Sequence, residues 1–305
     1  MEFEFVDWVR SRAPRSDKLL LGIGDDAAVL EIASQRCVVT SDMLMDGVDF
    51  VLDDTDPRRV GRKALAVNLS DLAAMAARPV AAIVSFAAPS DAPLDMLRNL
   101  YAGIFQLTEE YKISLAGGDT NTWQHPLAIS VTAFGEPSQR GFVTRNGASP
   151  GDVILVTGSF GGSLLGRHLD FQPRVAEALA LQERYRLNAM IDVSDGLSLD
   201  LFRVAEASGC GALVDLNMVP IADDARRLSK QRDDGQTPLD HALGDGEDFE
   251  LIIAVSPEVA CQLLVDQPLG IAIARIGEFI GERGLWQAMP DGTRQPLTVC
   301  GYEHQ

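Results

Sequence analysis

Two long segments in the first part of the chain carry apolar residues at helical spacing, and short continuous apolar runs follow each of them. Residues 57–77 begin with Pro57 and repeat Ala, Leu and Val at helical intervals, which predicts a helix. Residues 93–112 gather leucines and aromatic residues on one helical face. The short runs at 81–89 and 126–136 predict buried strands. Together these elements are typical of an α/β fold with mixed strands.

Three further segments place glycine or acidic residues next to predicted strands. Residues 16–40 predict short strands around a turn, and residues 113–120 predict a strand that runs into a Gly-Gly turn. Residues 189–216 predict a strand, an acidic turn, a helix closed by glycine, and another strand. The chain has no internal repeat of about 20–50 residues, which argues against a solenoid or propeller.

The segment 135–152 contains four glycines and two prolines but few large apolar residues. Such a composition is typical of a domain boundary. At about 100–200 residues per domain, a chain of 305 residues fits two domains. We therefore expect one domain over residues 1–137 and a second over residues 138–305.

Acidic residues outnumber basic ones by 44 to 26, which gives a net charge of −18. This charge repels nucleic-acid phosphates and anionic lipids, so we expect neither a nucleic acid nor a membrane as partner. No apolar run approaches the ~18–20 residues that span a bilayer, and the first residues lack the apolar core of a secretory signal. The four cysteines are widely separated, which fits a reducing compartment. We therefore expect a cytoplasmic protein.

Acidic residues recur at the ends of apolar stretches instead of on solvated faces. They are Asp25, Asp26, Asp42, Asp71, Asp119, Asp192 and Asp195, with Glu247 and Asp248 as a looser case. Taken singly, each is most simply a turn residue or, for Asp71, a helix cap. Taken together they are costly to bury without a compensating charge, and the residues directly around them include no Lys or Arg. A bound divalent cation would supply that charge.

The groups around these acids favour magnesium as the cation. Hydroxyls of Thr40, Ser41 and Ser194 accompany the acids, whereas His and Cys, the usual zinc ligands, do not. The spacing does not match an EF-hand loop. Neighbouring glycines allow phosphate oxygens to approach the backbone. Because Walker, Rossmann and protein-kinase motifs are absent from the sequence, the pattern indicates another kind of phosphoryl-transfer site, in which several Mg²⁺ ions bridge a nucleoside triphosphate.

Seven motifs occur in order: GIGDDAA, TSDxLxxGxxF, KALAVNLSDLAAM, LxGGDT, TRxGAxPGD, IDVSDGL and GEDFEL. In this order and spacing they resemble the thiamine-monophosphate kinase family, within the aminoimidazole ribonucleotide synthetase (PurM-like) superfamily. The resemblance implies ATP-dependent phosphorylation of thiamine monophosphate to thiamine diphosphate. It also implies two α/β domains with mixed sheets flanked by helices, and a homodimer formed through strands of the first domain.

The resemblance assigns roles by position. The first domain would bind metal and ATP and form the dimer, and the second would complete the ATP and substrate cleft. The implied magnesium ligands are Asp26, Thr40, Ser41, Asp42, Asp71, Asp119, Asp192 and Asp195. The implied ATP contacts are Gly118, Asp119, Arg145 and Ser194, and the implied thiamine-phosphate contacts are Asp49, Glu247 and Tyr302. Asp42 and Asp119 would assist direct in-line transfer, with no covalent nucleophile on the protein.

Three positions depart from the family pattern. Asp49 stands where the family often has histidine, GDGED stands where GGED is usual, and the segment 166–173 is short. Two other functions stay open: another ATP-dependent synthetase of the same superfamily, or a non-catalytic acidic protein that binds metal or nucleotide. Residues 1–36 lack the cysteine expected of synthetases that handle selenium or sulfur. A simple binder, for its part, has no need of acids from so many segments.

Overall fold

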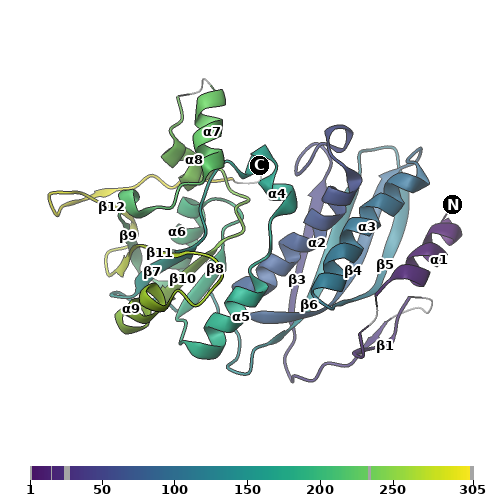
Figure 1. Ribbon diagram of the computed structural model, residues 1–305, viewed down its shortest axis with the longest axis horizontal. Coiled ribbons are helices and arrows are strands. Elements are labelled where there is room, and N and C mark those ends of the chain that lie inside the picture. Colours follow the sequence, from purple (N-terminus) through teal and green to yellow (C-terminus); the bar gives the residue numbers. More distant parts are fainter. Residues whose placement is uncertain (1, 15, 24–27, 233–234, 303–305) are drawn as a thin grey trace. The chain divides into compact units, whose positions relative to one another are not determined.

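The computed structural model describes residues 2–14, 16–23, 28–232 and 235–302. The chain divides into two compact units, one of residues 1–72 and 77–137 and the other of residues 73–76 and 138–305. Each unit combines a mixed sheet with helices (Figure 1), which confirms the predicted α/β class. No helix among the residues listed above is long and apolar enough to cross a membrane.

The first unit is built on a four-stranded sheet with the strand order β3-β6-β4-β5. Its strands are β3 (Val38–Met45), β4 (Ala77–Pro89), β5 (Ser114–Trp123) and β6 (Ala128–Pro137). β4 and β5 are parallel, and the other neighbours are antiparallel. The remaining elements are α1 (Glu2–Arg12), α2 (Pro57–Ala74), α3 (Leu94–Glu110) and an antiparallel pair of β1 (Leu19–Leu21) with β2 (Val29–Leu30).

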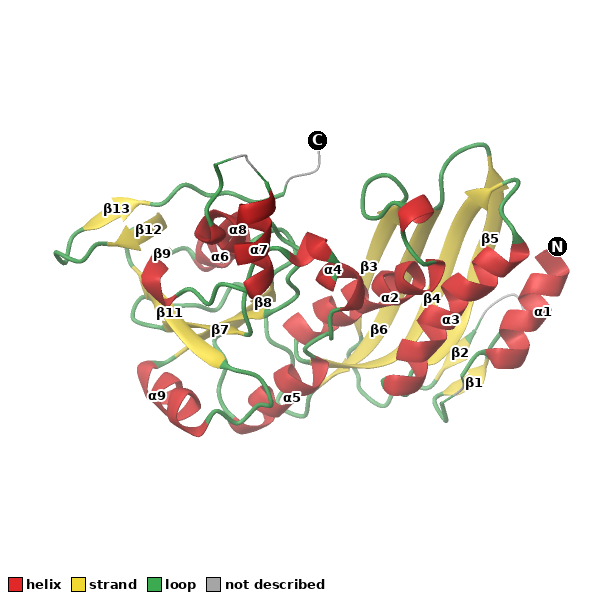
Figure 2. Ribbon diagram, turned by 45° about the horizontal axis from the view of Figure 1, so that its top comes forward, coloured by secondary structure: helices red, strands yellow, loops and turns green. Residues whose placement is uncertain are grey.

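The helices α2 and α3 cover one face of this sheet (Figure 2). They correspond to the helices predicted from apolar spacing, with small shifts at their ends. Side chains alternate between the two faces along β3, as in any strand. Leu44 is buried on the helix side, whereas Val39, Met43 and Met45 on the other side are 41–60% exposed. The sheet therefore has one covered face and one open, partly apolar face.

The strand β5 corrects one prediction. The chain does not turn at Gly117 and Gly118 but continues as a strand to Trp123, paired with β4. A Cβ atom at Gly118 would lie 1.8 Å from the carbonyl oxygen of Val84, so glycine allows a close backbone approach here. A pair of glycines looks the same in sequence whether it forms a turn or lets two backbones approach closely. The predicted turn at Gly117 and Gly118 was therefore wrong.

The helix α1 is a second difference, because the apolar pattern does not predict it. Its Phe5 is fully buried and packs edge-on against Tyr101 of α3 and Phe86 of β4, with ring centroids 5.1 and 5.8 Å apart. The helix is thus held by aromatic contacts with residues distant in sequence, which a local pattern does not reveal.

The second unit is built on a seven-stranded sheet with the order β13-β12-β9-β11-β7-β10-β8. Its strands are β7 (Val153–Thr157), β8 (Ala189–Asp192), β9 (Gly211–Val214), β10 (Leu251–Val255), β11 (Ile273–Ile280), β12 (Gly284–Ala288) and β13 (Arg294–Pro296). Its helices are α4 (Arg167–Asp170), α5 (Val175–Arg184), α6 (Leu197–Ser208), α7 (Asp223–Gln231), α8 (Pro238–Gly244) and α9 (Pro257–Asp266). The predicted succession of strand, acidic turn, helix and strand is confirmed as β8, α6 and β9.

The packing of α2 on α3 yields a prediction about stability. A Cβ atom at Gly61 would lie 1.8 Å from the carbonyl oxygen of Leu100, and one at Gly103 would lie 1.8 Å from that of Arg58. Because the two backbones touch here, we expect Gly61→Ala to lower the free energy of unfolding by about 1–3 kcal/mol or more. Urea titration measures this quantity.

The matched control is Gly270→Ala, since a Cβ atom there meets no atom of the described residues within 4 Å. We expect this variant to stay within about 0.5 kcal/mol of the parent. Helix propensity alone predicts that Gly61→Ala would stabilise α2. A gain in stability would therefore contradict the close helix contact.

Candidate functional site

The acidic site of the first unit lies where β3 faces α2. Thr40 and Asp42 are two residues apart on β3, so they point to the same face, the one covered by helices. The Thr40 hydroxyl donates a hydrogen bond to the Asp71 carboxylate on α2. The structure thus brings together three of the predicted magnesium ligands, Thr40, Asp42 and Asp71.

Electrostatics make Asp42 the most unusual group of this cluster. Burial, and then the neighbouring carboxylates of Asp71 and Asp49, raise the pKa of Asp42 to about 7. Its Oδ2 atom is buried and has no hydrogen-bond donor among the described residues. Burial also raises the pKa of Asp71, although the hydrogen bonds from Thr40 and Asp42 oppose the shift. Two adjacent carboxylates, one with a buried oxygen that lacks a donor, fit a site for a cation.

The chemistry of these donors fits magnesium, since carboxylate and hydroxyl oxygens are its preferred protein ligands. Within the part of the chain that the structure describes, no three acidic, His or Cys side chains form a group arranged to hold a metal ion. Ser41 points to the open face and hydrogen-bonds Thr132 at 2.9 Å. Asp26 lies outside the described residues.

Asp119 lies on the opposite edge of the sheet from Asp42. It is on β5 and Asp42 is on β3, with β6 and β4 between them. Three strand spacings of ~4.8 Å separate the two backbones by about 14 Å. The register also pairs Asp119 with Ser85, which pairs with Ser130 and then Met43 on the open face. One copy of this sheet therefore does not bring the two predicted catalytic acids together.

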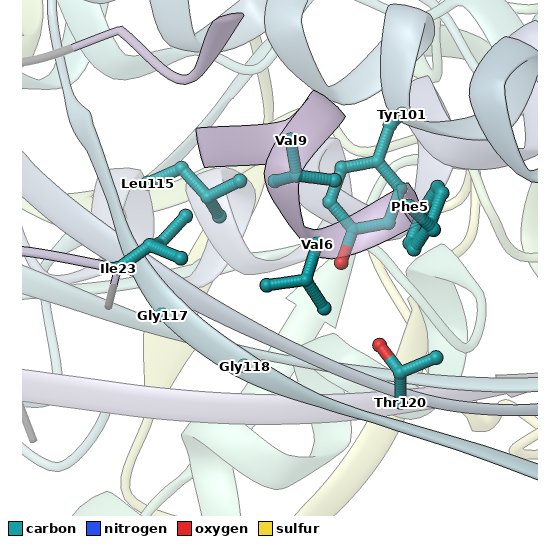
Figure 3. Close-up of a pocket in the computed structure, with 9 residues that line it drawn as sticks. All are labelled: Phe5, Val6, Val9, Ile23, Tyr101, Leu115, Gly117, Gly118 and Thr120. Atoms are coloured by element: carbon teal, nitrogen blue, oxygen red, sulfur yellow. The ribbon is translucent and has the colours of Figure 1, made fainter. Parts of the chain in front are cut away.

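A pocket beside β5 lies on its helix-covered side (Figure 3). It is lined by Phe5, Val6, Val9, Ile23, Tyr101, Leu115, Gly117, Gly118 and Thr120. Figure 3 shows the Tyr101 hydroxyl directed toward Val6 and Thr120. Burial raises the pKa of Tyr101, so the hydroxyl stays neutral and can donate a hydrogen bond. Sequence reasoning treated Tyr101 only as part of an apolar helix face, and its hydroxyl was the missed signal.

The second unit gathers four predicted site residues through backbone hydrogen bonds. The Glu247 amide donates to the Ser194 carbonyl at 2.7 Å, and the Tyr302 amide donates to the Asp195 carbonyl at 2.8 Å. The strand β8 ends at the buried Asp192, and Ser194 and Asp195 follow it after Val193. The acidic turn after β8 is therefore the meeting point of three distant segments.

Asp195 has a basic partner from outside its motif, where a cation was expected to supply the compensating charge. Arg203, two turns along α6, donates to Asp195 at 2.5 Å and to the buried Asp200 at 2.7 Å. Burial raises the pKa of Asp200 to about 6, although its hydrogen bonds and Arg203 counteract this. Arg203 lies outside the motif, but helical spacing returns its side chain to the turn.

The GDGED turn is held by an ion pair and by backbone hydrogen bonds that sequence reasoning did not identify. Asp248 accepts hydrogen bonds from the Gly161 amide at 2.9 Å and from Arg167 at 2.7 Å. Asp245 accepts one from the Gly162 amide at 2.8 Å. Glu247, between these two acids, has a φ of +53°, an uncommon conformation for a residue with a side chain. The glycine-rich turn after β7 thus fixes the segment that carries Glu247.

Asp49 lies close enough to Asp42 to raise its pKa, whereas Arg145 lies on an exposed loop. The Asp49 carboxylate accepts a hydrogen bond from the Met45 amide at 2.6 Å, and its carbonyl accepts one from Lys63 at 2.8 Å. These bonds fix the loop after β3. Arg145 is exposed, and its carbonyl accepts a bond from the Ser208 hydroxyl at 3.3 Å.

Comparison with known proteins identifies the family. Residues 24–136 match the family model for the N-terminal domain of AIR synthase related protein, and residues 149–285 match its C-terminal domain. A thiamine-monophosphate kinase of Rhodopirellula baltica is 40% identical over 312 residues, which cover 100% of this chain and 97% of that protein. The chain belongs to the thiamine-monophosphate kinase family.

Solved structures of this family share the fold. The thiamine-monophosphate kinase from Stenotrophomonas maltophilia K279a superposes with a TM-score of 0.80 at 35% identity, over 95% of this chain and 96% of that one. A ThiL protein solved in complex with AMPPCP and TMP superposes with a TM-score of 0.78 at 28% identity, over 100% of this chain and 97% of that one. The two-domain PurM-like architecture expected from the motifs is therefore confirmed for this thiamine-monophosphate kinase family member.

The raised pKa of Asp42 predicts how stability depends on pH. Between about pH 4 and 7, folded Asp42 keeps a proton that the unfolded chain releases. The metal-free protein therefore loses stability as pH rises through this interval. We expect Asp42→Asn to reduce this loss, so that at pH 8 its melting temperature exceeds the parent's by about 2–4 °C per kcal/mol gained.

Thermal melts in chelator between pH 5 and 8 measure this effect. Millimolar Mg²⁺ should raise the melting temperature of the parent more at pH 8 than at pH 5, because protons compete with the ion. Identical pH dependence for the parent and for Asp42→Asn would show that Asp42 ionises normally.

Proposed function

We propose that this protein transfers the γ-phosphoryl group of ATP to thiamine monophosphate, which gives ADP and thiamine diphosphate. Family membership over the whole chain carries the proposal, and the buried acidic site between β3 and α2 supports it. The ThiL relative binds AMPPCP, an ATP analogue, together with TMP, as expected for such a reaction.

The acceptor phosphate is largely ionised at pH 7, so it needs no strong general base and no covalent nucleophile on the protein. The main barrier is the repulsion between two polyanions. Mg²⁺, when bound, would neutralise phosphate charge, and Thr40, Asp42 and Asp71 are the residues best arranged to hold it. The protein's own part is to align donor and acceptor in line.

The pocket beside β5 is our candidate for the nucleoside end of ATP. Its walls are mostly apolar, as a base requires, and Tyr101 supplies one polar group. Gly117 and Gly118 line the pocket without side chains, so a phosphate chain can approach their backbone. Asp119 follows these glycines directly, and its side chain lies on the other, open face of the strand.

A homodimer through the open face of the four-stranded sheet would complete this site. Val39, Met43 and Met45 expose apolar side chains on that face, which a second copy can bury. Because Asp42 and Asp119 lie on opposite edges of one sheet, we propose that Asp119 from one subunit acts with Asp42 from the other. The several ions that we expect would then be shared between subunits.

The second unit would supply the acceptor side of the reaction. Ser194, Asp195, Glu247 and Tyr302 are the residues proposed to contact ATP, metal or thiamine phosphate there, because their backbones are already joined. Arg145 would hold phosphate oxygens, as a guanidinium can do bidentately. We further propose that Asp192 is a metal ligand and that Asp49 contacts the thiamine phosphate. The four cysteines are free, which supports a cytoplasmic location.

The direct test incubates purified protein with ATP, Mg²⁺ and thiamine monophosphate and follows products by mass spectrometry. We expect ADP and thiamine diphosphate in equal amounts, and a fall in kcat of at least about 100-fold for Asp42→Asn. The control is Asp291→Asn, an exposed turn acid on which activity should not depend.

Other outcomes would assign another function. ADP without thiamine diphosphate would indicate a different acceptor within the superfamily. Nucleotide binding without ADP would favour the non-catalytic binder. Near-normal turnover by Asp42→Asn would remove the acidic site from the mechanism.

Subunit complementation tests the shared site. Asp42→Asn and Asp119→Asn chains carrying different tags are co-expressed, and the heterodimer is isolated. If each site takes Asp42 from one subunit and Asp119 from the other, one of two sites is intact and about half of parental activity returns. A heterodimer as inactive as the two mutant homodimers would place both acids in one chain's site.

A further inference from the structure

Asn68 is a buried polar residue of α2 to which neither the motifs nor the resemblance gives a role. Its side chain is fully buried. The amide nitrogen donates to the Ala64 carbonyl one turn earlier at 3.1 Å, whereas Oδ1 has no hydrogen-bond donor among the described residues. A buried amide oxygen without a donor costs about 1–3 kcal/mol, so an apolar residue would suit a purely structural position better.

Contacts at two levels of α2 place Asn68 near Asp42. Asp71 of α2 contacts Thr40 within β3, and Lys63, two turns earlier, reaches the Asp49 carbonyl beyond the end of β3. The helix therefore runs antiparallel to the strand, on the covered face (Figure 2). Asn68 lies about 4.5 Å before Asp71 along the helix, and Asp42 lies about 6.6 Å after Thr40 along the strand. The two residues are thus at similar levels on facing elements.

Both residues present an oxygen that no described residue satisfies. Oδ2 of Asp42 and Oδ1 of Asn68 are buried, and neither has a donor within the described ranges. Repulsion keeps two acceptor oxygens apart unless a donor or a cation lies between them. Amide carbonyl oxygens are ligands that hard divalent cations accept in proteins, directly or through a bound water.

We propose that Asn68 is a further ligand of the divalent cation held by Asp42 and Asp71, through Oδ1 directly or through one of the ion's waters. The inference rests on the cation site of the proposed function. A neutral ligand suits this position, because Asp42 and Asp71 already repel each other and a third carboxylate would add to that repulsion.

The test measures Mn²⁺ binding to the full-length protein at pH 8 by electron paramagnetic resonance of the free ion, together with thermal unfolding in chelator. Asn68→Leu keeps the size of the side chain and removes its oxygen. We expect Mn²⁺ affinity to fall by about 10-fold or more, while the metal-free melting temperature is unchanged or higher. If this variant does not fold, Asn68→Ala removes the amide without new branching and is measured in the same way.

The matched control is Gln182→Met on α5. The Gln182 Oε1 is likewise buried with no donor in the described part of the chain, but the residue belongs to the other compact unit and to none of the proposed ligand sets. We expect Mn²⁺ affinity to be unchanged in this variant. Equal losses of Mn²⁺ affinity in Gln182→Met and Asn68→Leu would show that the effect comes from a general loss of packing, and would overturn the proposal.

Two further outcomes separate this inference from the function on which it rests. A lower metal-free melting temperature with parental Mn²⁺ affinity in Asn68→Leu would make Asn68 a structural residue. If Asp42→Asn weakens Mn²⁺ binding and Asn68→Leu does not, the cation site stands and only the role of Asn68 fails. If neither variant changes Mn²⁺ affinity, the cation site itself is wrong.

Discussion

Two carboxylates, those of Asp42 and Asp71, lie side by side in a largely buried place between β3 and α2, and the role proposed for the first unit depends on that arrangement. Desolvation and mutual repulsion both disfavour their ionised forms. The site persists because the surrounding packing holds α2 in place. The helix is buried along almost its whole length, and its backbone touches α3 at Gly61 and Gly103. Packing energy from the helices thus offsets the unfavourable electrostatic arrangement on which the proposed cation site depends.

In the second unit, several buried acids form ion pairs with arginines. Asp195 and Asp200 share Arg203, Asp248 pairs with Arg167, and Glu250 pairs with Arg174. These ion pairs hold the turns after β7 and β8 and before β10 in one arrangement. The first unit therefore leaves negative charge available for a cation, whereas the second uses arginines to fix the loops that carry Ser194 and Glu247. This division fits one unit that binds metal and another that positions substrate.

The elements that depend on local pattern were predictable from the sequence. Apolar spacing predicted α2 and α3, and the order of strand, acidic turn and helix predicted β8 and α6. The association of Thr40, Asp42 and Asp71 also followed, because acids at the ends of apolar stretches are rarely left without a partner. Contacts between distant segments were not predictable. The aromatic packing that forms α1, the close approach of Gly118 to Val84 and the return of Arg203 to Asp195 all depend on tertiary structure.

The placement of Asp119 is the clearest example of a long-range feature that the sequence did not predict. Its motif is as strong as that of Asp42, yet strand order puts the two acids on opposite edges of the sheet. Strand order depends on long-range pairing, which a single sequence does not reveal. For this reason the proposed site takes Asp42 and Asp119 from two copies of the chain.

The most direct test of the central claim is anomalous diffraction from crystals of this protein grown with Mn²⁺ and a non-hydrolysable ATP analogue. The account predicts an anomalous peak within coordinating distance of carboxylate oxygens of both Asp42 and Asp71. Full Mn²⁺ occupancy elsewhere, with Asp42 and Asp71 still adjacent and no peak between them, would contradict it.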